Sequence, residues 1–224
     1  YARHEFKDGK LGVFWHTQGS GKSYSMLFFV RKIMRKLQGK HTFIILTDRV
    51  ELDKQLRNTF SSCGVLGNLT PSTYVALNGN DLIEKIKDKT PIVFSLIHKF
   101  NKPDVEPYYP DHEVIIISDE AHRSQNGVYA ENLCHFLPTA SRIGFTGTPI
   151  FSSNELTART FGEYISTYDF KRAVDDNATV PLYYENRGEK LKDIKNPEIT
   201  QEMLDAIEAA ELDENQREKL YNEF

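Results

Sequence analysis

The sequence predicts an α/β domain in which a mostly parallel sheet is covered by helices on both faces. Three observations support this fold class. Continuous apolar runs, typical of buried parallel strands, alternate with stretches of helical periodicity. A glycine-rich loop joins the first apolar run to the first helical stretch. Polar and acidic residues directly follow later apolar runs, and binding sites form at the carboxyl ends of parallel strands.

The first element is a strand predicted at residues 11–15, which is followed by the loop His16-Thr17-Gln18-Gly19-Ser20-Gly21-Lys22-Ser23. The helix after it is predicted to end near Gly39. Glycines let successive backbone N–H groups turn toward an anion, and a helix N-terminus adds positive potential. We therefore predict that residues 17–23 bind nucleotide phosphates, with Lys22 on the outer phosphates and the Ser23 hydroxyl on Mg²⁺. His16 stands where the general G-x-x-x-x-G-K-[ST] pattern has glycine. The alternative to phosphate binding is a plain glycine turn before a core helix.

The middle of the chain continues the alternation of strands and helices. In order, the pattern predicts a strand at 41–47, a helix at 50–60, a loop with a short strand at 66–77, a helix at 80–88 and a strand at 91–96. The strands are continuous apolar runs, whereas the first of these helices spaces its apolar residues three or four apart. The second helix is expected to be capped by Asn80.

The last part of the chain becomes less regular. Three prolines predict a surface loop at 101–112, and the pattern then predicts a strand at 113–118, a helix at 129–137, a strand at 141–145, a helix at 168–176 and a strand at 179–184. The charged stretch 200–223 has a helical pattern and is either solvated or packed on something else. We expect a first domain at residues 1–178, and a linker or the start of a following region with an acidic helical tail at residues 179–224.

Two acidic residues, Asp119 and Glu120, directly follow the strand predicted at 113–118. Nucleotide hydrolysis needs a carboxylate near the metal ion and a group that orients or deprotonates the attacking water. Asp119 is the predicted metal residue together with Ser23, and Glu120 is the predicted water-activating residue. With Lys22 these two acids form the predicted catalytic set. The alternative is an acidic turn that begins a loop.

The composition limits the class of protein. The net charge is −4, and residues 185–224 hold 12 acidic and 6 basic residues, so the rest of the chain is mildly positive. This balance neither demonstrates nor excludes a groove that tracks phosphates. Cys63 and Cys134 lack the spacing of a metal site, and we expect neither a disulfide framework nor a zinc site, which fits a reducing cytoplasm. No apolar run approaches the roughly 20 residues of a membrane span. The chain begins at Tyr1, and we expect it to be part of a longer one.

Three strings occur in the order of helicase motifs I, II and III: residues 16–23, Asp119-Glu120-Ala121-His122 and Thr146-Gly147-Thr148-Pro149. The second resembles the DEAH box of superfamily 2 helicases. Finer strings resemble the restriction (motor) subunit of type I restriction-modification enzymes; these are residues 15–23, Thr47-Asp48-Arg49-Val50-Glu51-Leu52, residues 119–124, 144–150, 161–164 and 173–176. The resemblance covers residues 11 to about 184.

The resemblance implies the first RecA-like P-loop domain of an ATP-dependent translocase that moves double-stranded DNA, with ATP and Mg²⁺ as cofactors. It also implies a nuclease domain and a second motor domain in the same full-length chain, and methyltransferase and specificity subunits as partners. The second motor domain is expected to supply the arginines that complete the ATP site. This chain alone is therefore expected to hydrolyse ATP weakly or not at all. The expected location is the cytoplasm, without a membrane partner.

The resemblance further assigns DNA contacts to Arg49, Ser95 and Lys99, and the coupling of ATP hydrolysis to motion to His122, Thr146 and Thr148. Ordinary structural roles are the alternatives. Arg49 would simply begin a helix and pair with Glu51 or Asp53. Lys99 would be solvated. His122 would be a loop histidine, and the threonines would cap a turn.

Three rival functions stay open. A superfamily 2 helicase that separates DNA or RNA strands shares the same motifs. A nucleotide-binding interaction module without turnover would also keep the glycine loop. A structural piece whose acidic tail binds partner subunits is the third. The presence of Lys22, Asp119 and Glu120 argues against the module without turnover.

Overall fold

A six-stranded sheet is the centre of the structure, a computed structural model that describes residues 9–99, 106–121, 128–148 and 160–181. The chain divides into two units, Tyr1–Pro181 and Leu182–Phe224. All of the described residues belong to the first unit, and the second lies outside them.

The sheet is parallel throughout its described strands. These are β1 (Lys10–His16), β2 (His41–Thr47), β3 (Ile92–Leu96), β4 (Glu113–Ser118), β5 (Ser141–Thr146) and β6 (Tyr164–Tyr168). They lie in the order β3-β2-β4-β5-β1-β6, and each neighbouring pair is parallel. The predicted fold class is therefore confirmed, and the carboxyl ends of all six strands meet along one edge.

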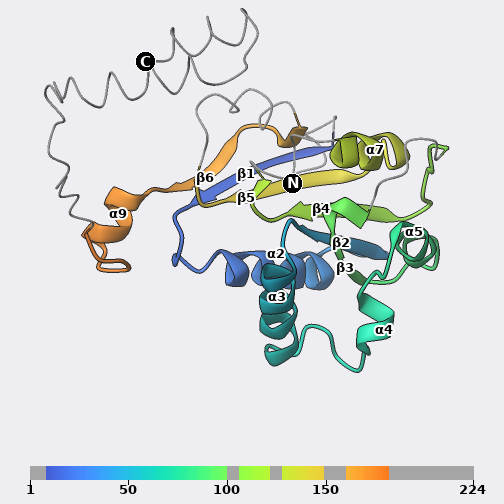
Figure 1. Cartoon of the computed structure of the whole chain (residues 1–224), viewed down its shortest axis with the longest axis horizontal. Helices are drawn as coiled ribbons and strands as arrows, with labels where there is room; N and C mark the ends of the chain where they lie inside the picture. The colour runs from blue at the N-terminus through green and yellow to red at the C-terminus, as the bar shows by residue number, and fades with distance from the viewer. Residues whose placement is uncertain (1–8, 100–105, 122–127, 149–159, 182–224) are drawn as a thin grey trace, which may run out of the picture. The chain divides into compact units, whose positions relative to one another are not determined.

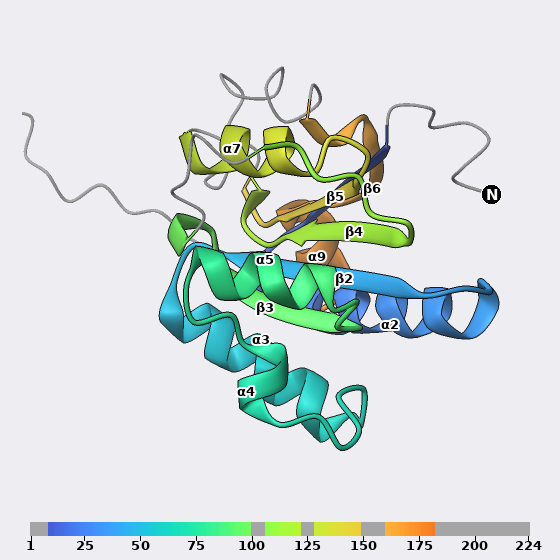
Figure 2. The same cartoon turned by 90° about the vertical axis from the view of Figure 1, so that its right-hand side faces the viewer.

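Helices cover both faces of this sheet. They are α2 (Lys22–Lys36), α3 (Val50–Ser62), α4 (Pro71–Tyr74), α5 (Gly79–Lys87), α7 (Val128–Phe136) and α9 (Phe170–Asp175), with a 3₁₀ turn η1 (Ile97–Lys99) after β3. Figures 1 and 2 show α2 and α3 on one face of the sheet and α7 on the other.

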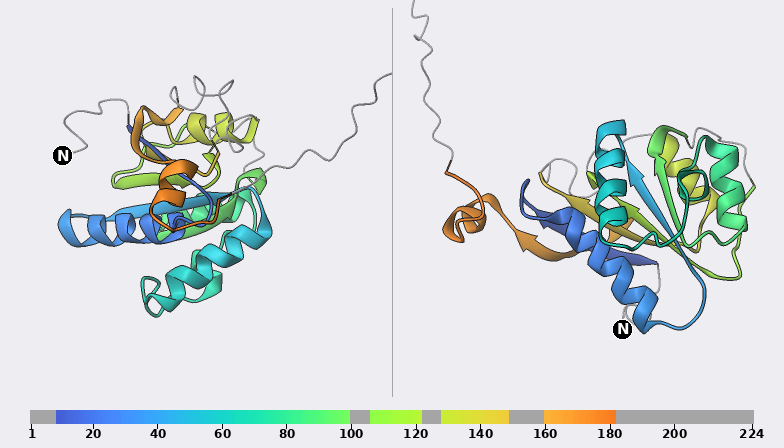
Figure 3. Two further views of the ribbon diagram at one scale, coloured as in Figure 1. Left: turned by 90° about the vertical axis from the view of Figure 1, so that its left-hand side faces the viewer. Right: turned by 90° about the horizontal axis from the view of Figure 1, so that it is seen from below.

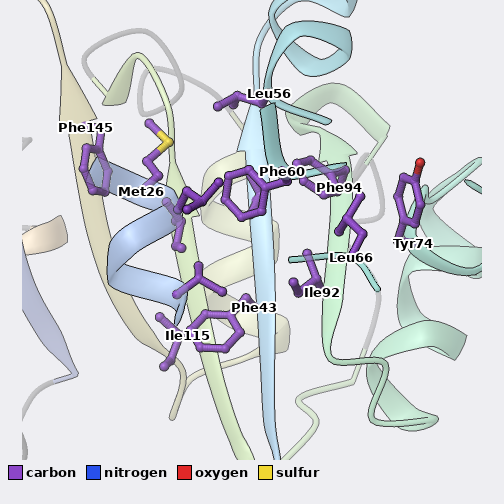
Figure 4. Packing of buried hydrophobic residues seen from close by; sticks show 14 of the residues in the cluster. Met26, Phe43, Leu56, Phe60, Leu66, Tyr74, Ile92, Phe94, Ile115 and Phe145 are labelled. Atoms are coloured by element: carbon purple, nitrogen blue, oxygen red, sulfur yellow. The ribbon is translucent and has the colours of Figure 1, made fainter. Parts of the chain in front are cut away.

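Alternate residues of the central strands supply two apolar cores, one on each face. On one face Phe43 of β2 packs with Met26 of α2 and Phe60 of α3, and all three are fully buried (Figure 4). The neighbouring residue Ile44 belongs to the other core, together with Leu133 of α7. Burial of a large apolar side chain stabilises a fold by about 1.5–3 kcal/mol. Because both faces are covered, the strands read as continuous apolar runs rather than as alternating ones.

The segment between α3 and β3 differs from the prediction. The short strand expected within 66–77 is wrong, because Pro71–Tyr74 is the helical turn α4 and a single isolated bridge, Val75 to Phe94, is the β-pairing that the structure describes there. The cap of α5 is also wrong by two residues. Its cap is Asn78, whose side-chain oxygen accepts the N–H groups of Asn80 and Asp81 at 2.9 and 3.1 Å.

The region after β5 holds a strand that the sequence pattern missed. The helix predicted at 168–176 is α9, but β6 precedes it and adds an edge to the sheet beside β1. Most side chains of β6 are exposed, so the strand lacks the apolar run that marks the others. Residues 179–181 are not a strand, and the rest of the strand predicted at 179–184 lies outside the described residues, as does the helix predicted at 200–223.

Candidate functional site

The loop between β1 and α2 is shaped by two glycines. Gly19 and Gly21 have φ angles of +84° and +85°, a left-handed conformation that favours glycine. A Cβ atom at either position would meet nothing within 4 Å, so backbone conformation rather than space requires glycine there. Ser20 closes the loop, because its N–H and its hydroxyl both donate to the carbonyl of Thr17. The predicted phosphate-binding segment is therefore a closed turn with two left-handed bends.

The N-terminus of α2 opens directly from this loop. Gly21 is the residue that precedes the helix; within the described chain no side chain caps α2, and its first turn holds no acidic residue. The N–H groups that begin a helix have no partner within it, and the helix dipole favours an anion beside them. The partly buried Ser23 hydroxyl has no hydrogen-bond partner among the described residues. These features suit a phosphate and a cation ligand.

The ammonium group of Lys22 lies against the beginning of its own loop. Its Nζ donates to the carbonyls of His16 and Thr17, at 3.1 and 3.4 Å. Gly147, just beyond β5, faces the same ammonium. A Cβ atom built on Gly147 would lie 3.1 Å from Lys22 Nζ and 3.6 Å from the backbone nitrogen of Gln18. The parallel pairing of β1 with β5 thus brings the Thr146–Thr148 turn against the phosphate loop.

Asp119 follows β4 directly and is 8% exposed. Its N–H donates to the carbonyl of Leu46 at 2.9 Å, and its Oδ1 accepts the N–H of Glu120 at 3.0 Å. Burial is the largest cause that raises the pKa of Asp119, to about 6. The carboxylates of Glu120 and Asp48 also raise it, whereas the Glu120 N–H and the Lys22 ammonium lower it. A buried carboxylate whose charge is disfavoured by its neighbours suits a cation, so the chemistry of this residue fits Mg²⁺.

The backbone turns sharply at the second acid. Glu120 has a φ angle of +48°, which is uncommon for a residue with a side chain. The next residue, Ala121, is fully buried and packs with Phe161. A Cβ atom at Gly144 of β5 would come within 2.9 Å of the Ala121 Cβ, so the bare backbone of β5 makes room for this packing. The position of the two acids is therefore held by the apolar contact that follows them.

The threonines predicted to couple hydrolysis to motion form a turn at the end of β5. The Thr146 side chain is 1% exposed, and its hydroxyl donates to the carbonyl of Thr148 at 3.3 Å. This contact is the turn-capping role named as the alternative. The coupling role of the two threonines stays a prediction. His122 lies outside the described residues.

Two of the three predicted DNA-contacting residues hold the fold together. Ser95 is buried in β3 at 1% exposure, and its hydroxyl donates to the Leu96 carbonyl, so its side chain does not reach the surface. The Nζ atom of Lys99 donates to the carbonyl of Ala76 at 2.7 Å, which ties η1 to the chain before α5. The predicted DNA contact of Ser95 is inconsistent with this burial, and Lys99 is bonded rather than solvated.

Arg49 remains accessible. Its side chain is 57% exposed just before α3, and its Nε lies 3.7 Å from the Asp48 carboxylate. The long contact is with Asp48 rather than with Glu51 or Asp53, the two acids named in the alternative. Asp53 instead pairs with Arg57 at 2.8 Å. An exposed guanidinium at such a distance still has donors for a phosphate.

Sequence reasoning missed two residues near the site. Asp48 follows β2 as Asp119 follows β4, so the rule that functional groups gather at strand ends contained a signal for it. Gly147 stood inside a quoted string without a role, and its contact with Lys22 depends on strand order, which the pattern does not specify.

Comparison with known proteins adds a family. The sequence matches the SWI2/SNF2 ATPase family over residues 2–218. A candidate type I restriction enzyme endonuclease subunit, MjaIXP of Methanocaldococcus jannaschii, is 41% identical over 81% of this chain and 17% of its own length. The type I restriction enzyme HindI endonuclease subunit of Haemophilus influenzae is 40% identical over 83% of this chain and 19% of its own length. The chain thus spans less than a fifth of these relatives.

A solved structure shares the fold. It is a nuclease-deletion mutant of the type ISP restriction-modification enzyme LlaGI in complex with a DNA substrate mimic, with a TM-score of 0.57 and 19% identity over 79% of this chain and 19% of that chain. The likeness supports the predicted RecA-like architecture. No helix in the described part of the chain is long and apolar enough to cross a membrane.

Proposed function

The chain belongs to the SWI2/SNF2 ATPase family, and from this membership we propose that it is the first ATP-binding motor domain of a type I restriction endonuclease subunit. Its proposed role is to use ATP hydrolysis to move double-stranded DNA. The names of the two relatives with 41% and 40% identity support the restriction assignment. The observation that supports ATP binding is that Gly147 and Asp119, which follow the strands β5 and β4, lie near Lys22 at the start of α2.

Each group in the site has a proposed task. The N–H groups of the loop and of the start of α2 bind phosphate oxygens, and Lys22 neutralises the outer phosphates. Ser23 and Asp119 would hold Mg²⁺, which supplies positive charge to the transferring phosphoryl group. The Glu120 carboxylate accepts a proton from the attacking water. Arg49 contacts the phosphate backbone of DNA without reading its sequence.

The proposal extends to the whole protein. Residues 1–178 form the motor domain and residues 179–224 lead toward a second motor domain. In this proposal the full-length chain also contains that second motor domain and a nuclease domain. Methyltransferase and specificity subunits complete the restriction-modification complex. Displacement of a DNA triplex by the full-length protein without separation of duplex strands supports translocation, whereas strand separation supports the helicase alternative.

Replacement of Lys22 tests the nucleotide site. We expect Lys22→Ala to weaken binding of Mg²⁺–ATP about 10- to 100-fold, because one charge-assisted contact contributes about 1.5–3 kcal/mol. Isothermal titration calorimetry on the 224-residue protein measures this. Lys32→Ala removes an exposed lysine from the same helix and should leave the affinity unchanged. Equal affinities for wild type and Lys22→Ala would rule out the assignment.

A further inference from the structure

The missed strand β6 holds the beginning of the phosphate loop. The N–H of Thr17 donates to the carbonyl of Tyr168 at 2.9 Å. The His16 Nε2 atom lies 2.7 Å from the Ser166 hydroxyl oxygen, and the His16 and Tyr168 rings are 5.7 Å apart. Strand β6 is therefore attached to the loop both through backbone and through side chains. Figures 1 and 3 show α9 beyond the carboxyl ends of β1 and β6, beside this loop.

An aromatic ring and a cation lie together on this side of the loop. The guanidinium of Arg172, on α9, lies 5.7 Å from the centre of the Tyr168 ring. The Tyr168 hydroxyl donates to the Asp176 carboxylate at 3.0 Å, so the ring is fixed at its far end as well. Arg172 is exposed and Tyr168 is half-buried. Burial lowers the pKa of His16, with smaller contributions from Lys22 and Arg172, so the positive charges of α2 and α9 both act on the first residue of the loop.

The strand order indicates how a bound nucleotide would be oriented along the edge of the sheet. Asp119 follows β4 and Gly147 follows β5, so the groups proposed for the metal and the outer phosphates lie on the β5 side of β1. On the other side of β1 lies β6. A nucleotide whose terminal phosphate faces Lys22 and Asp119 therefore has its nucleoside end toward β6 and α9.

We propose that Tyr168 and Arg172 form the nucleobase subsite for the nucleoside triphosphate whose phosphates the loop binds. This inference rests on the proposed function for the position of the phosphates. A flat base gains from stacking on an aromatic ring or on a planar guanidinium, and both groups are present. An exposed arginine is accessible to such a ligand. The subsite would explain why the end of β6 carries an aromatic residue and α9 a cation next to the loop.

The test separates the base from the phosphates. Calorimetric titrations use Mg²⁺–ATP and, in parallel, Mg²⁺–tripolyphosphate, which lacks the nucleoside. Arg172→Ala and Tyr168→Leu should each weaken ATP about 5- to 30-fold, in line with measured stacking and cation–π contributions. Neither variant should change tripolyphosphate affinity more than about twofold. Arg35→Ala is the matched control, because Arg35 is an exposed arginine 13 residues along α2 from Lys22, or roughly 20 Å.

Other results of these titrations would overturn the nucleobase subsite or the proposed function. Equal weakening of ATP and tripolyphosphate in Arg172→Ala would make Arg172 a phosphate contact and overturn the subsite. Unchanged ATP affinity in both variants would overturn it as well. If Lys22→Ala leaves both ligands unaffected, the proposed function itself fails. Photolabelling of the wild-type protein with 8-azido-ATP does not depend on how the variants fold. It should mark the peptide that spans residues 164–176, and labelling confined to other peptides would contradict the proposal.

Discussion

Charged side chains have different surroundings in two regions of the sheet, the end of β4 beside the phosphate loop and the end of β3. Asp119 is buried where its surroundings raise its pKa to about 6, so the fold disfavours its charge. Lys99 donates to the Ala76 carbonyl, and its charge opposes the rise that burial causes in the pKa of Asp53. Both residues stood in strings that predicted function. The difference teaches that a charged group at a strand end indicates a binding site when the fold disfavours its charge, and a structural contact when the fold bonds it to its own backbone.

The largest expected effect concerns Glu120, which follows Asp119 at the end of β4. Glu120→Gln in the full-length protein should lower steady-state ATP turnover about 10²- to 10⁴-fold, because the amide cannot accept the proton of the attacking water. ATP affinity should stay within about twofold of wild type. Glu131→Gln, an exposed change on α7, is the control for turnover. Parallel losses of affinity and turnover would instead show that Glu120 holds the turn.

An intermediate effect is expected from Asp119 in buffer with EDTA. The folded-state pKa of Asp119 is raised, so the contribution of this residue to stability is fully present below about pH 4 and is lost as pH rises through about 6. Asp119→Asn removes this loss, and a displacement from the ordinary value of 3.8 to about 6 corresponds to roughly 3 kcal/mol. Urea unfolding at pH 8 should therefore show a more stable variant, and the gain should vanish near pH 4.

The control for Asp119 has the opposite sign. The hydrogen bond from Lys89 lowers the pKa of the exposed Asp111, so Asp111→Asn should lose stability above its pKa rather than gain it. A gain for Asp119→Asn that does not depend on pH would mean that its cause is packing rather than charge.

The smallest expected effect lies at the end of β3. Lys99→Met keeps the length of the side chain but leaves the Ala76 carbonyl without its 2.7 Å donor, which should cost about 1–3 kcal/mol of unfolding free energy. Duplex DNA affinity, measured by fluorescence anisotropy, should not change.

Arg49→Ala should have the reverse effect, with unchanged stability and weaker, less salt-dependent DNA binding. If Lys99→Met lost DNA affinity while its stability stayed normal, Lys99 would be a DNA contact rather than a structural residue.

Local sequence was enough for the elements and for the centre of the site. The strands β2 and β4 have the bounds that their apolar runs predict, 41–47 and 113–118. The loop bends at Gly19 and Gly21 because glycine tolerates positive φ, which is a property of single residues. The capping residue of α5 and the helical turn α4 were missed, since two asparagines compete for one cap and a short polar segment has no clear period.

The sequence by itself determined the alternation of strands and helices, the glycine loop, and the acids that follow β4, because each depends on neighbours in the chain. Only the tertiary structure decided which distant residues lie next to the glycine loop and the acids. The order β4-β5-β1-β6 places Gly147 beside Lys22 and places β6 beside β1, where the His16 Nε2 atom lies 2.7 Å from the hydroxyl oxygen of Ser166, 150 positions along the chain. Burial decided that Ser95 is structural and that Asp119 has a raised pKa. Strand order and burial arise from contacts between distant segments, and these leave no local period in the sequence from which they can be predicted.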